Sequence, residues 1–70
     1  MDIEWENGFT LKVCIDNEGT VLISANKEGL RSLARQLTAL ADEAAGCHIH
    51  YDEFNSLEEG SSSMIIEKKQ

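Results

Sequence analysis

The chain has 70 residues, with 13 Asp and Glu against 6 Lys and Arg, and a formal net charge of −7 at pH 7. This length predicts a single domain over residues 1–70 and leaves little room for a deep substrate cavity. The acidic balance repels phosphate backbones and anionic lipids, so we expect neither nucleic acid nor membrane as a partner. A basic protein is the natural complement, although acidity can also serve solubility alone.

The N-terminal segment, residues 1–6, is acidic and lacks a long apolar run, so we expect no signal peptide there. No stretch approaches the ~20 apolar residues that a membrane helix needs. Cys14 and Cys47 are too few for a disulfide framework. These features predict a cytoplasmic protein with free thiols.

The first 26 residues predict three strands. Apolar and polar residues alternate over residues 9–16, the period-two pattern of a half-buried strand. Asn17-Glu18-Gly19 then forms a three-residue hairpin loop, with glycine in the left-handed position. This loop fixes the register and places the paired apolar residues on one face: Ile15 with Val21, Val13 with Ile23 and Leu11 with Ala25.

An earlier strand precedes a turn that contains Asn7-Gly8. A two-residue turn would place Glu4 and Glu6 on the apolar face, because one residue of register reverses every side chain. A three-residue loop over residues 6–8 instead pairs Trp5 with Phe9 and Ile3 with Leu11. Burial favours the second arrangement, which completes a three-stranded meander.

Residues 27–45 predict one amphipathic helix. Asn26 is a good N-cap, and Gly46 is expected to end the helix. Gly29 costs up to ~1 kcal/mol relative to alanine, which predicts a loose first turn. The expected core-facing stripe is apolar and consists of Leu30, Leu33, Ala34, Leu37, Leu40, Ala41 and Ala44.

A basic stripe on the same helix is formed by Lys27, Arg31 and Arg35, at spacing i, i+4 and i+8. It is either a solvated face or a contact for an acidic patch on a partner, on a second copy or on this chain.

Two further strands follow, over residues 47–51 and 62–68, with Cys47, Ile49 and Tyr51 pointing inward. The predicted fold is α+β: a βββαββ domain whose single antiparallel or mixed sheet carries one helix on one face. The connection over residues 52–61 is too long for a tight hairpin, and loops of this length in small domains are often functional.

The pattern His48-x-His50-x-Asp52 is the sharpest local motif. Alternate strand residues lie ~6.6 Å apart on one face, so both imidazoles could reach one metal ion, whereas Asp52 lies ~13 Å from His48 on a straight strand. A structural zinc site needs four ligands, and Cys14 is the one further candidate on that face. We therefore favour two histidines exposed for contacts over a metal site, and expect no bound metal.

No arrangement for catalysis is visible. Cys47 and His48 face opposite sides of the sheet, and the sequence has no phosphate loop, GxSxG or HExxH. We expect a protein that is not an enzyme and holds no cofactor.

The loop itself is acidic. Residues 46–61 include Asp52, Glu53, Glu58 and Glu59 and no Lys or Arg. Phe54 and Leu57 stand among these acids; they either pin the loop to the core or form apolar anchors for a basic partner.

The sheet face away from the helix is less polar than a solvated face usually is. Cys14, Leu22 and Ile65 are expected there, beside Thr10, Ser24 and the histidines. This composition suits a homodimer or heteromeric interface, and it is also compatible with scattered exposed apolar residues.

Two segments carry a family resemblance: residues 26–34, NKEGLRSLA, and residues 46–67, which begin GCHIHYDEFNSLEEGS. Together they resemble the immunity protein 32 family of bacterial polymorphic toxin systems over about residues 21–69. The resemblance implies an α+β cytoplasmic binding protein, without cofactor or catalysis, that neutralises a cognate toxin.

We therefore expect a small antitoxin-like protein that acts by occlusion, docking its acidic loop and histidine face on a basic toxin domain. The candidate partner-binding residues are His48, His50, Asp52, Glu53, Asn55, Glu58 and Glu59. The alternatives are a homodimeric protein that uses its open sheet face and a metal-binding accessory protein that uses the two histidines.

Overall fold

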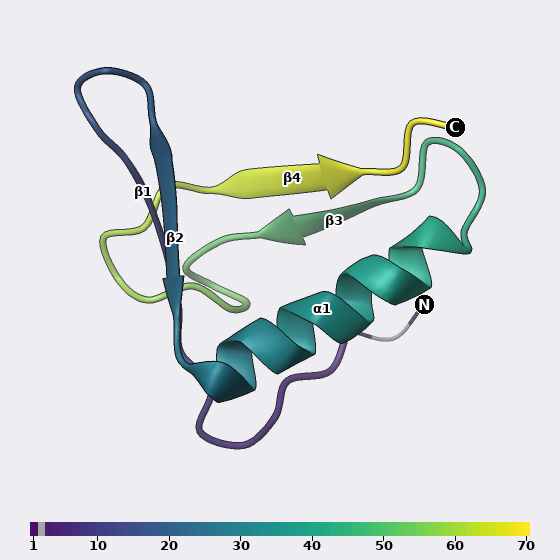
Figure 1. Cartoon of the computed structure of the whole chain (residues 1–70), viewed down its shortest axis with the longest axis horizontal. Helices are drawn as coiled ribbons and strands as arrows, with labels where there is room; N and C mark the ends of the chain where they lie inside the picture. The colour runs from purple at the N-terminus through teal and green to yellow at the C-terminus, as the bar shows by residue number, and fades with distance from the viewer. Residues whose placement is uncertain (2) are drawn as a thin grey trace.

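The computed structural model describes residues 1 and 3–70; Asp2 lies outside the described residues. Two β-hairpins are joined by one helix (Figure 1). The fold is α+β as predicted, but its order is ββαββ rather than βββαββ. The elements are β1 (Leu11–Ile15), β2 (Val21–Ala25), α1 (Lys27–Ala41), β3 (His48–Tyr51) and β4 (Met64–Glu67).

The β1–β2 hairpin has the predicted register, with Ile15 opposite Val21, Val13 opposite Ile23 and Leu11 opposite Ala25. Its turn relies on Gly19, whose φ of +84° favours glycine. The expected burial holds only near the base of the hairpin. Leu11 and Val13 are buried, whereas Ile15 and Val21 are each 55% exposed, because the hairpin tip projects away from the rest of the molecule (Figure 1).

The predicted first strand is wrong. Residues 3–6 run along α1, where helix side chains satisfy their backbone: Glu6 N–H donates to Ser32 Oγ over 2.8 Å, and Gln36 Nε2 donates to the Glu4 carbonyl over 2.8 Å. These bonds replace strand pairing, so the expected pairing of Ile3 with Leu11 is not made.

The turn at Asn7-Gly8 closes between Glu6 and Phe9, whose N–H donates to the Glu6 carbonyl over 3.2 Å. The predicted three-residue loop is therefore wrong. The predicted contact of Trp5 with Phe9 still forms, because the two rings stack with centroids 4.3 Å apart.

Helix α1 begins as predicted, with Asn26 as its N-cap. Asn26 Oδ1 accepts from Gly29 N–H over 2.8 Å and from Thr10 N–H over 3.0 Å, which ties the first turn to the chain ahead of β1. The helix ends at Ala41 and not at residue 45. Lys68 Nζ donates to the Ala41 carbonyl over 2.7 Å, and residues 42–46 turn the chain into β3.

The buried face of α1 also differs from the predicted stripe. Leu33 and Leu40 are buried, but Leu30 is 53% exposed and Leu37 36%. Polar residues take the middle of the buried face, because the N-terminal segment and β3 offer them hydrogen-bond partners. The residues that α1 buries are Gly29, Ser32, Leu33, Gln36 and Leu40.

The predicted single sheet is replaced by two two-stranded sheets. In the second, His48 pairs with Glu67 and His50 with Ile65. The connection between β3 and β4 blocks a continuous sheet by occupying the outer edge of β1: its residues 58 and 62 donate N–H groups to the carbonyls of Leu11 and Val13.

The core lies between the base of the first hairpin, α1 and the inner face of β3. No helix among residues 1 and 3–70 is long and apolar enough to cross a membrane. The buried apolar residues are Leu11, Val13, Leu33, Leu40, Ile49, Tyr51 and Leu57.

Candidate partner-binding surface

The acidic loop, residues 52–61, is held by its own side chains. Asp52 Oδ1 accepts from the N–H groups of Phe54 and Asn55, and the Asp52 carbonyl accepts from Leu57 N–H over 2.8 Å. Asn55 Nδ2 reaches back to the His50 carbonyl over 3.0 Å. The loop start is therefore a compact Asx turn fixed to the end of β3.

The two halves of the loop are also joined, because Glu53 Oε2 accepts from Gly60 N–H over 2.9 Å. Asp52 and Glu53 thus have structural bonds as well as charge. No side-chain hydrogen bond involves Glu58 or Glu59 among the described residues, and both are exposed.

The two apolar residues of the loop have opposite surroundings. Leu57 is 5% exposed and belongs to the core cluster, which confirms the pinning role for this residue. Phe54 is 99% exposed. A fully solvated phenyl ring on a hydrogen-bonded loop contributes nothing to the core, so it is available to a partner.

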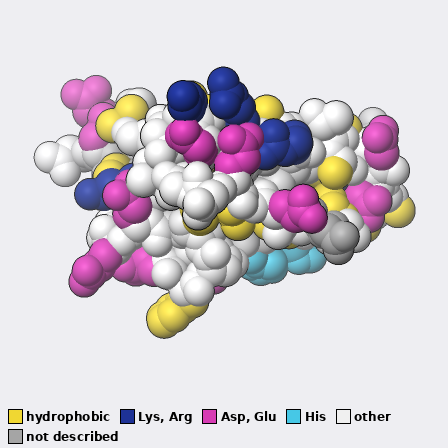
Figure 2. Space-filling model, turned by 90° about the horizontal axis from the view of Figure 1, so that it is seen from below, with side chains coloured by type: hydrophobic (Ala, Val, Ile, Leu, Met, Phe, Trp, Pro, Cys, Tyr) yellow, Lys and Arg dark blue, Asp and Glu magenta, His cyan; other side chains and the backbone are white. Residues whose placement is uncertain are grey.

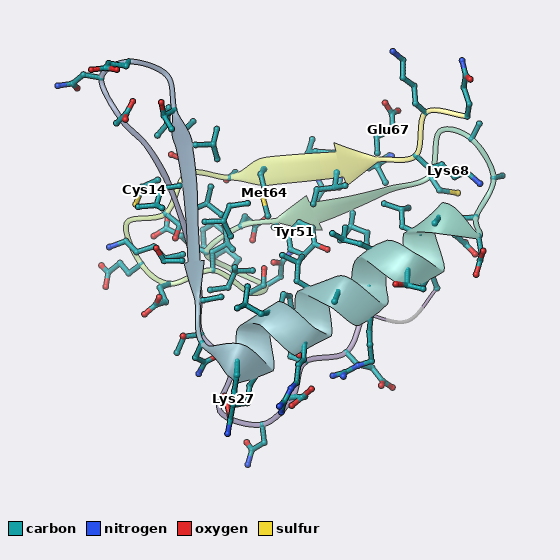
Figure 3. The ribbon with its side chains drawn as sticks, in the orientation of Figure 1. Cys14, Lys27, Tyr51, Met64, Glu67 and Lys68 are labelled. Carbon is teal, nitrogen blue, oxygen red and sulfur yellow. The ribbon has the colours of Figure 1, made fainter. Side chains whose placement is uncertain are left out.

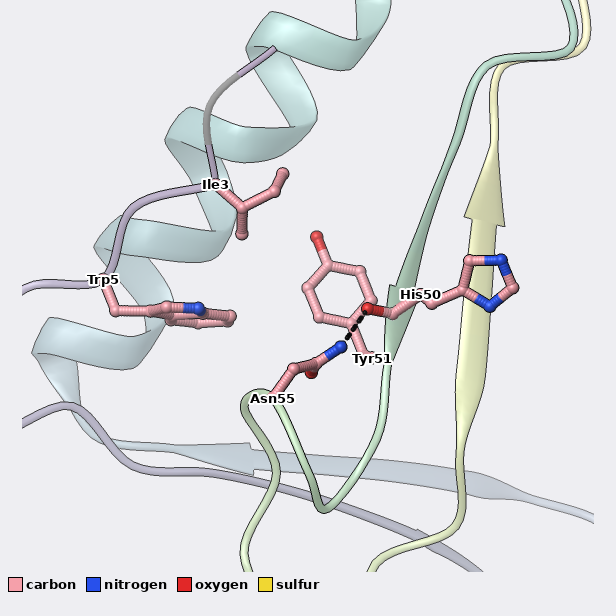
Figure 4. Close-up of a pocket in the computed structure, with 5 residues that line it drawn as sticks. All are labelled: Ile3, Trp5, His50, Tyr51 and Asn55. Atoms are coloured by element: carbon pink, nitrogen blue, oxygen red, sulfur yellow. Dashed lines mark hydrogen bonds between the residues drawn. The ribbon is translucent and has the colours of Figure 1, made fainter.

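The two histidines lie on the exposed face of β3, with ring centroids 4.9 Å apart. His48 Nδ1 is 3.0 Å from the Gly46 carbonyl. Figure 4 shows the His50 ring pointing away from α1, on the opposite side of β3 from Tyr51. The predicted alternation of β3 is confirmed, with Ile49 and Tyr51 buried.

Two histidines do not complete a metal site here. In the described part of the chain, no group of three or more His, Cys, Asp or Glu side chains is placed to hold a metal ion. Cys14, the third ligand considered from the sequence, lies on β1 in the other sheet. Both cysteines are free and half-buried.

The basic stripe of α1 forms no ion pair with the loop among the described residues. Arg35 pairs with Glu6, with 2.7 Å between Nη2 and Oε2, and this is the one ion pair among the described residues. Figure 2 shows the larger group of Lys and Arg side chains and the histidines on opposite edges of the molecule. The loop carboxylates therefore remain without an ion-pair partner among the described residues.

A shallow pocket of about 350 Å³ opens beside the start of the loop and was not expected from the sequence. Figure 4 shows its lining, in which the Tyr51 ring and the backbone of His50 face the Trp5 ring. Trp5 could not be placed there by pattern alone, because its position depends on the unpredicted path of residues 3–6 along α1. The lining residues are Ile3, Trp5, His50, Tyr51 and Asn55.

Of the candidate residues, the structure joins His50, Asp52 and Asn55 by hydrogen bonds where β3 meets the loop. His48 lies at the other end of β3, and Glu53, Glu58 and Glu59 lie on the loop. Sequence reasoning left Phe54 undecided between core and surface. Its spacing from Leu57, three residues within a turn, was the signal that the two side chains need not point the same way.

The chain is thus a small α+β domain with an acidic loop between β3 and β4, and this loop exposes Phe54, Glu58 and Glu59. The family model of immunity protein 32 matches residues 20–69. The chain belongs to the immunity protein 32 family, and the resemblance seen in the sequence is confirmed. Comparisons with curated proteins and with solved structures give no match.

Proposed function

We propose that this protein neutralises a cognate toxin by occlusion, docking the acidic loop on a basic surface of the toxin domain. The family supplies the class of partner, since it is one of immunity proteins. The full exposure of Phe54 on an ordered acidic loop is the observation that carries the proposed interface.

In this proposal Phe54 is the apolar anchor. Aromatic side chains that insert into a partner's pocket dominate many interfaces, and charged neighbours fix the orientation of the complex. The turn around Asp52 already orders the backbone of Phe54, so docking costs little loop entropy. Asn55 is next to the anchor in the loop, and the two histidines lie on the exposed face of β3; in this proposal, they contribute polar contacts at the rim.

The carboxylates steer the encounter. Asp52, Glu53, Glu58 and Glu59 add to the net charge of −7, and opposite fields raise association rates at low ionic strength. Binding without chemistry is sufficient for this function, so we propose a protein that is not an enzyme. A cytoplasmic location, where the chain would meet a toxin before export, is part of the same proposal.

The test starts from capture of basic proteins by the tagged chain from a lysate of its own cells, followed by purification of each captured protein. A captured protein is accepted as the toxin only if its expression stops cell growth and co-expression of the wild-type chain restores it. We expect Phe54→Ala to lose this protection. Full protection by Phe54→Ala would contradict the proposed interface.

Charge is tested with Glu58→Lys and Glu59→Lys together, because these side chains carry none of the loop's hydrogen bonds. Asp42→Lys with Glu43→Lys, at the end of α1, is the matched control for the same change in net charge. We expect association with the purified toxin to slow about tenfold at low salt for the loop variant, and much less for the control. Equal rates for both variants would contradict steering by the loop.

A further inference from the structure

The outer edge of β2 is open. β1 and β2 form a sheet of their own, and the residues from Val21 to Ser24 are all exposed. In an antiparallel pair, alternate residues direct their backbone N–H and C=O away from the neighbouring strand. On β1 these residues include Leu11 and Val13, whose carbonyls are taken by the acidic loop and its continuation.

By the register, the corresponding residues on β2 are Val21, Ile23 and Ala25. Across residues 1 and 3–70, no hydrogen bond from outside the hairpin reaches their backbone groups. The chain therefore presents a row of donors and acceptors that another extended strand can satisfy.

β2 lacks the side chains that usually oppose pairing at a sheet edge. Its sequence, VLISA, contains no charged residue and no proline, and Leu22 is 61% exposed. β4 differs, because it carries Glu67 and is followed at once by Lys68 and Lys69. Charged residues are the usual means by which edge strands avoid pairing, and β2 lacks them.

The charges at the two ends of β2 are opposite. Asp16 and Glu18 lie in the turn that precedes Val21, whereas the exposed side chains of Lys27 and Arg31 follow Ala25. Glu28 also follows, but it is half-buried. A second β2 running antiparallel brings the acidic turn of each copy toward the basic start of α1 in the other, whereas a parallel one brings like charges together.

We propose that β2 pairs with β2 of a second copy of this chain, antiparallel and centred on Ile23. This register places Ile23 opposite itself and Val21 opposite Ala25, so all three residues exchange N–H and C=O with the partner strand.

The proposed pairing gives a closed dimer. In each copy, the acidic loop and its continuation already bond to the outer edge of β1 at Leu11 and Val13, so this part of the edge is not open to a further copy. The contact is two-fold symmetric and produces a dimer rather than a filament. The acidic loops stay outside the contact, so this inference is independent of the toxin proposal and is tested without a toxin.

The test is the mass of the untagged chain in solution, by light scattering or analytical ultracentrifugation. We expect twice 7.8 kDa for the wild type and 7.8 kDa for Ile23→Pro. The N–H of Ile23 faces the open edge, so proline removes a bond to the partner and none to β1. Val21→Lys is the second variant, since it charges the edge at an exposed position and leaves every backbone donor in place. Leu37→Lys, at an exposed apolar position further along α1, is the control that stays dimeric.

Circular dichroism establishes that each variant is folded. Two charge substitutions test whether the acidic turn and the basic start of α1 attract each other across the dimer. Lys27→Glu is expected to weaken the dimer, and Glu18→Lys in the same chain to restore it. A monomeric wild type up to about 1 mM, or a dimer that persists in folded Ile23→Pro and Val21→Lys, overturns the proposal.

Discussion

The hydroxyl of Tyr51 donates a hydrogen bond to Gln36 Oε1 over 2.9 Å, and both residues are buried. Gln36 also donates to the Glu4 carbonyl. One polar side chain of α1 therefore joins the N-terminal segment, the helix and β3. Figure 3 shows Tyr51 between β3 and α1.

Tyr51→Phe removes the donor and leaves Gln36 Oε1 buried without a partner. We expect a loss of about 1–2 kcal/mol in the free energy of unfolding. Urea denaturation at pH 7 measures it. The double variant with Gln36→Leu reports coupling between the two residues, and additive losses in that variant would show that the bond contributes little.

Alkaline pH is expected to act through the same tyrosine, because burial raises the pKa of Tyr51 above its ordinary value near 10. The folded state then holds the phenolic proton to higher pH than the unfolded state. Its contribution to stability is full below pH ~10 and falls as the pH rises from there toward the raised pKa. The wild type should lose more stability than Tyr51→Phe between pH 9 and 11, and parallel losses would exclude this contribution.

Gly29 is required by a close approach and not by turn geometry. A methyl group added there would overlap the carbonyl oxygen of Thr10 and lie 3.1 Å from Ala25 Cβ. We expect Gly29→Ala to destabilise the protein by about 1–3 kcal/mol, although alanine is the better helix former. Ala34→Gly, on the exposed side of α1, is the comparison and should cost up to ~1 kcal/mol. A stabilised Gly29→Ala in thermal denaturation would contradict the observed packing.

The two apolar residues of the acidic loop make a matched pair. Leu57→Ala should cost about 2–5 kcal/mol in stability, since it opens a cavity in the core. Phe54→Ala should change stability by less than about 0.5 kcal/mol, because its side chain is 99% exposed. Thermal unfolding of both variants checks this contrast, and a large loss for Phe54→Ala would mean that the ring is buried in solution.

The features that could be predicted from the sequence are those set by neighbouring residues: a turn, a helix start and the alternation of one strand. The glycine at position 19 and the length of its loop set the β1–β2 register, and the side chain of Asn26 set the start of α1. The period-two alternation of β3 correctly predicted that Ile49 and Tyr51 lie on the buried face of the strand and that the histidines lie on its exposed face.

The errors arose where distant groups competed for the backbone. Ser32 and Gln36 hold residues 4 and 6 against α1, and this withdrew the predicted first strand from the sheet. The same two polar residues shifted the buried face of the helix away from Leu30 and Leu37. For the candidate site, the acidic residues and histidines were visible in the sequence, whereas the separate environments of Phe54 and Leu57 depend on the turn around Asp52.

Docking of the acidic loop on a toxin is best tested by measuring the dissociation constant of the purified toxin for Phe54→Ala and for the wild type. An anchor worth about 2 kcal/mol predicts a dissociation constant about thirtyfold higher, with the variant as stable as the wild type. An unchanged dissociation constant for the folded variant would contradict the role of Phe54 as the anchor and would mean that the toxin binds elsewhere on the molecule.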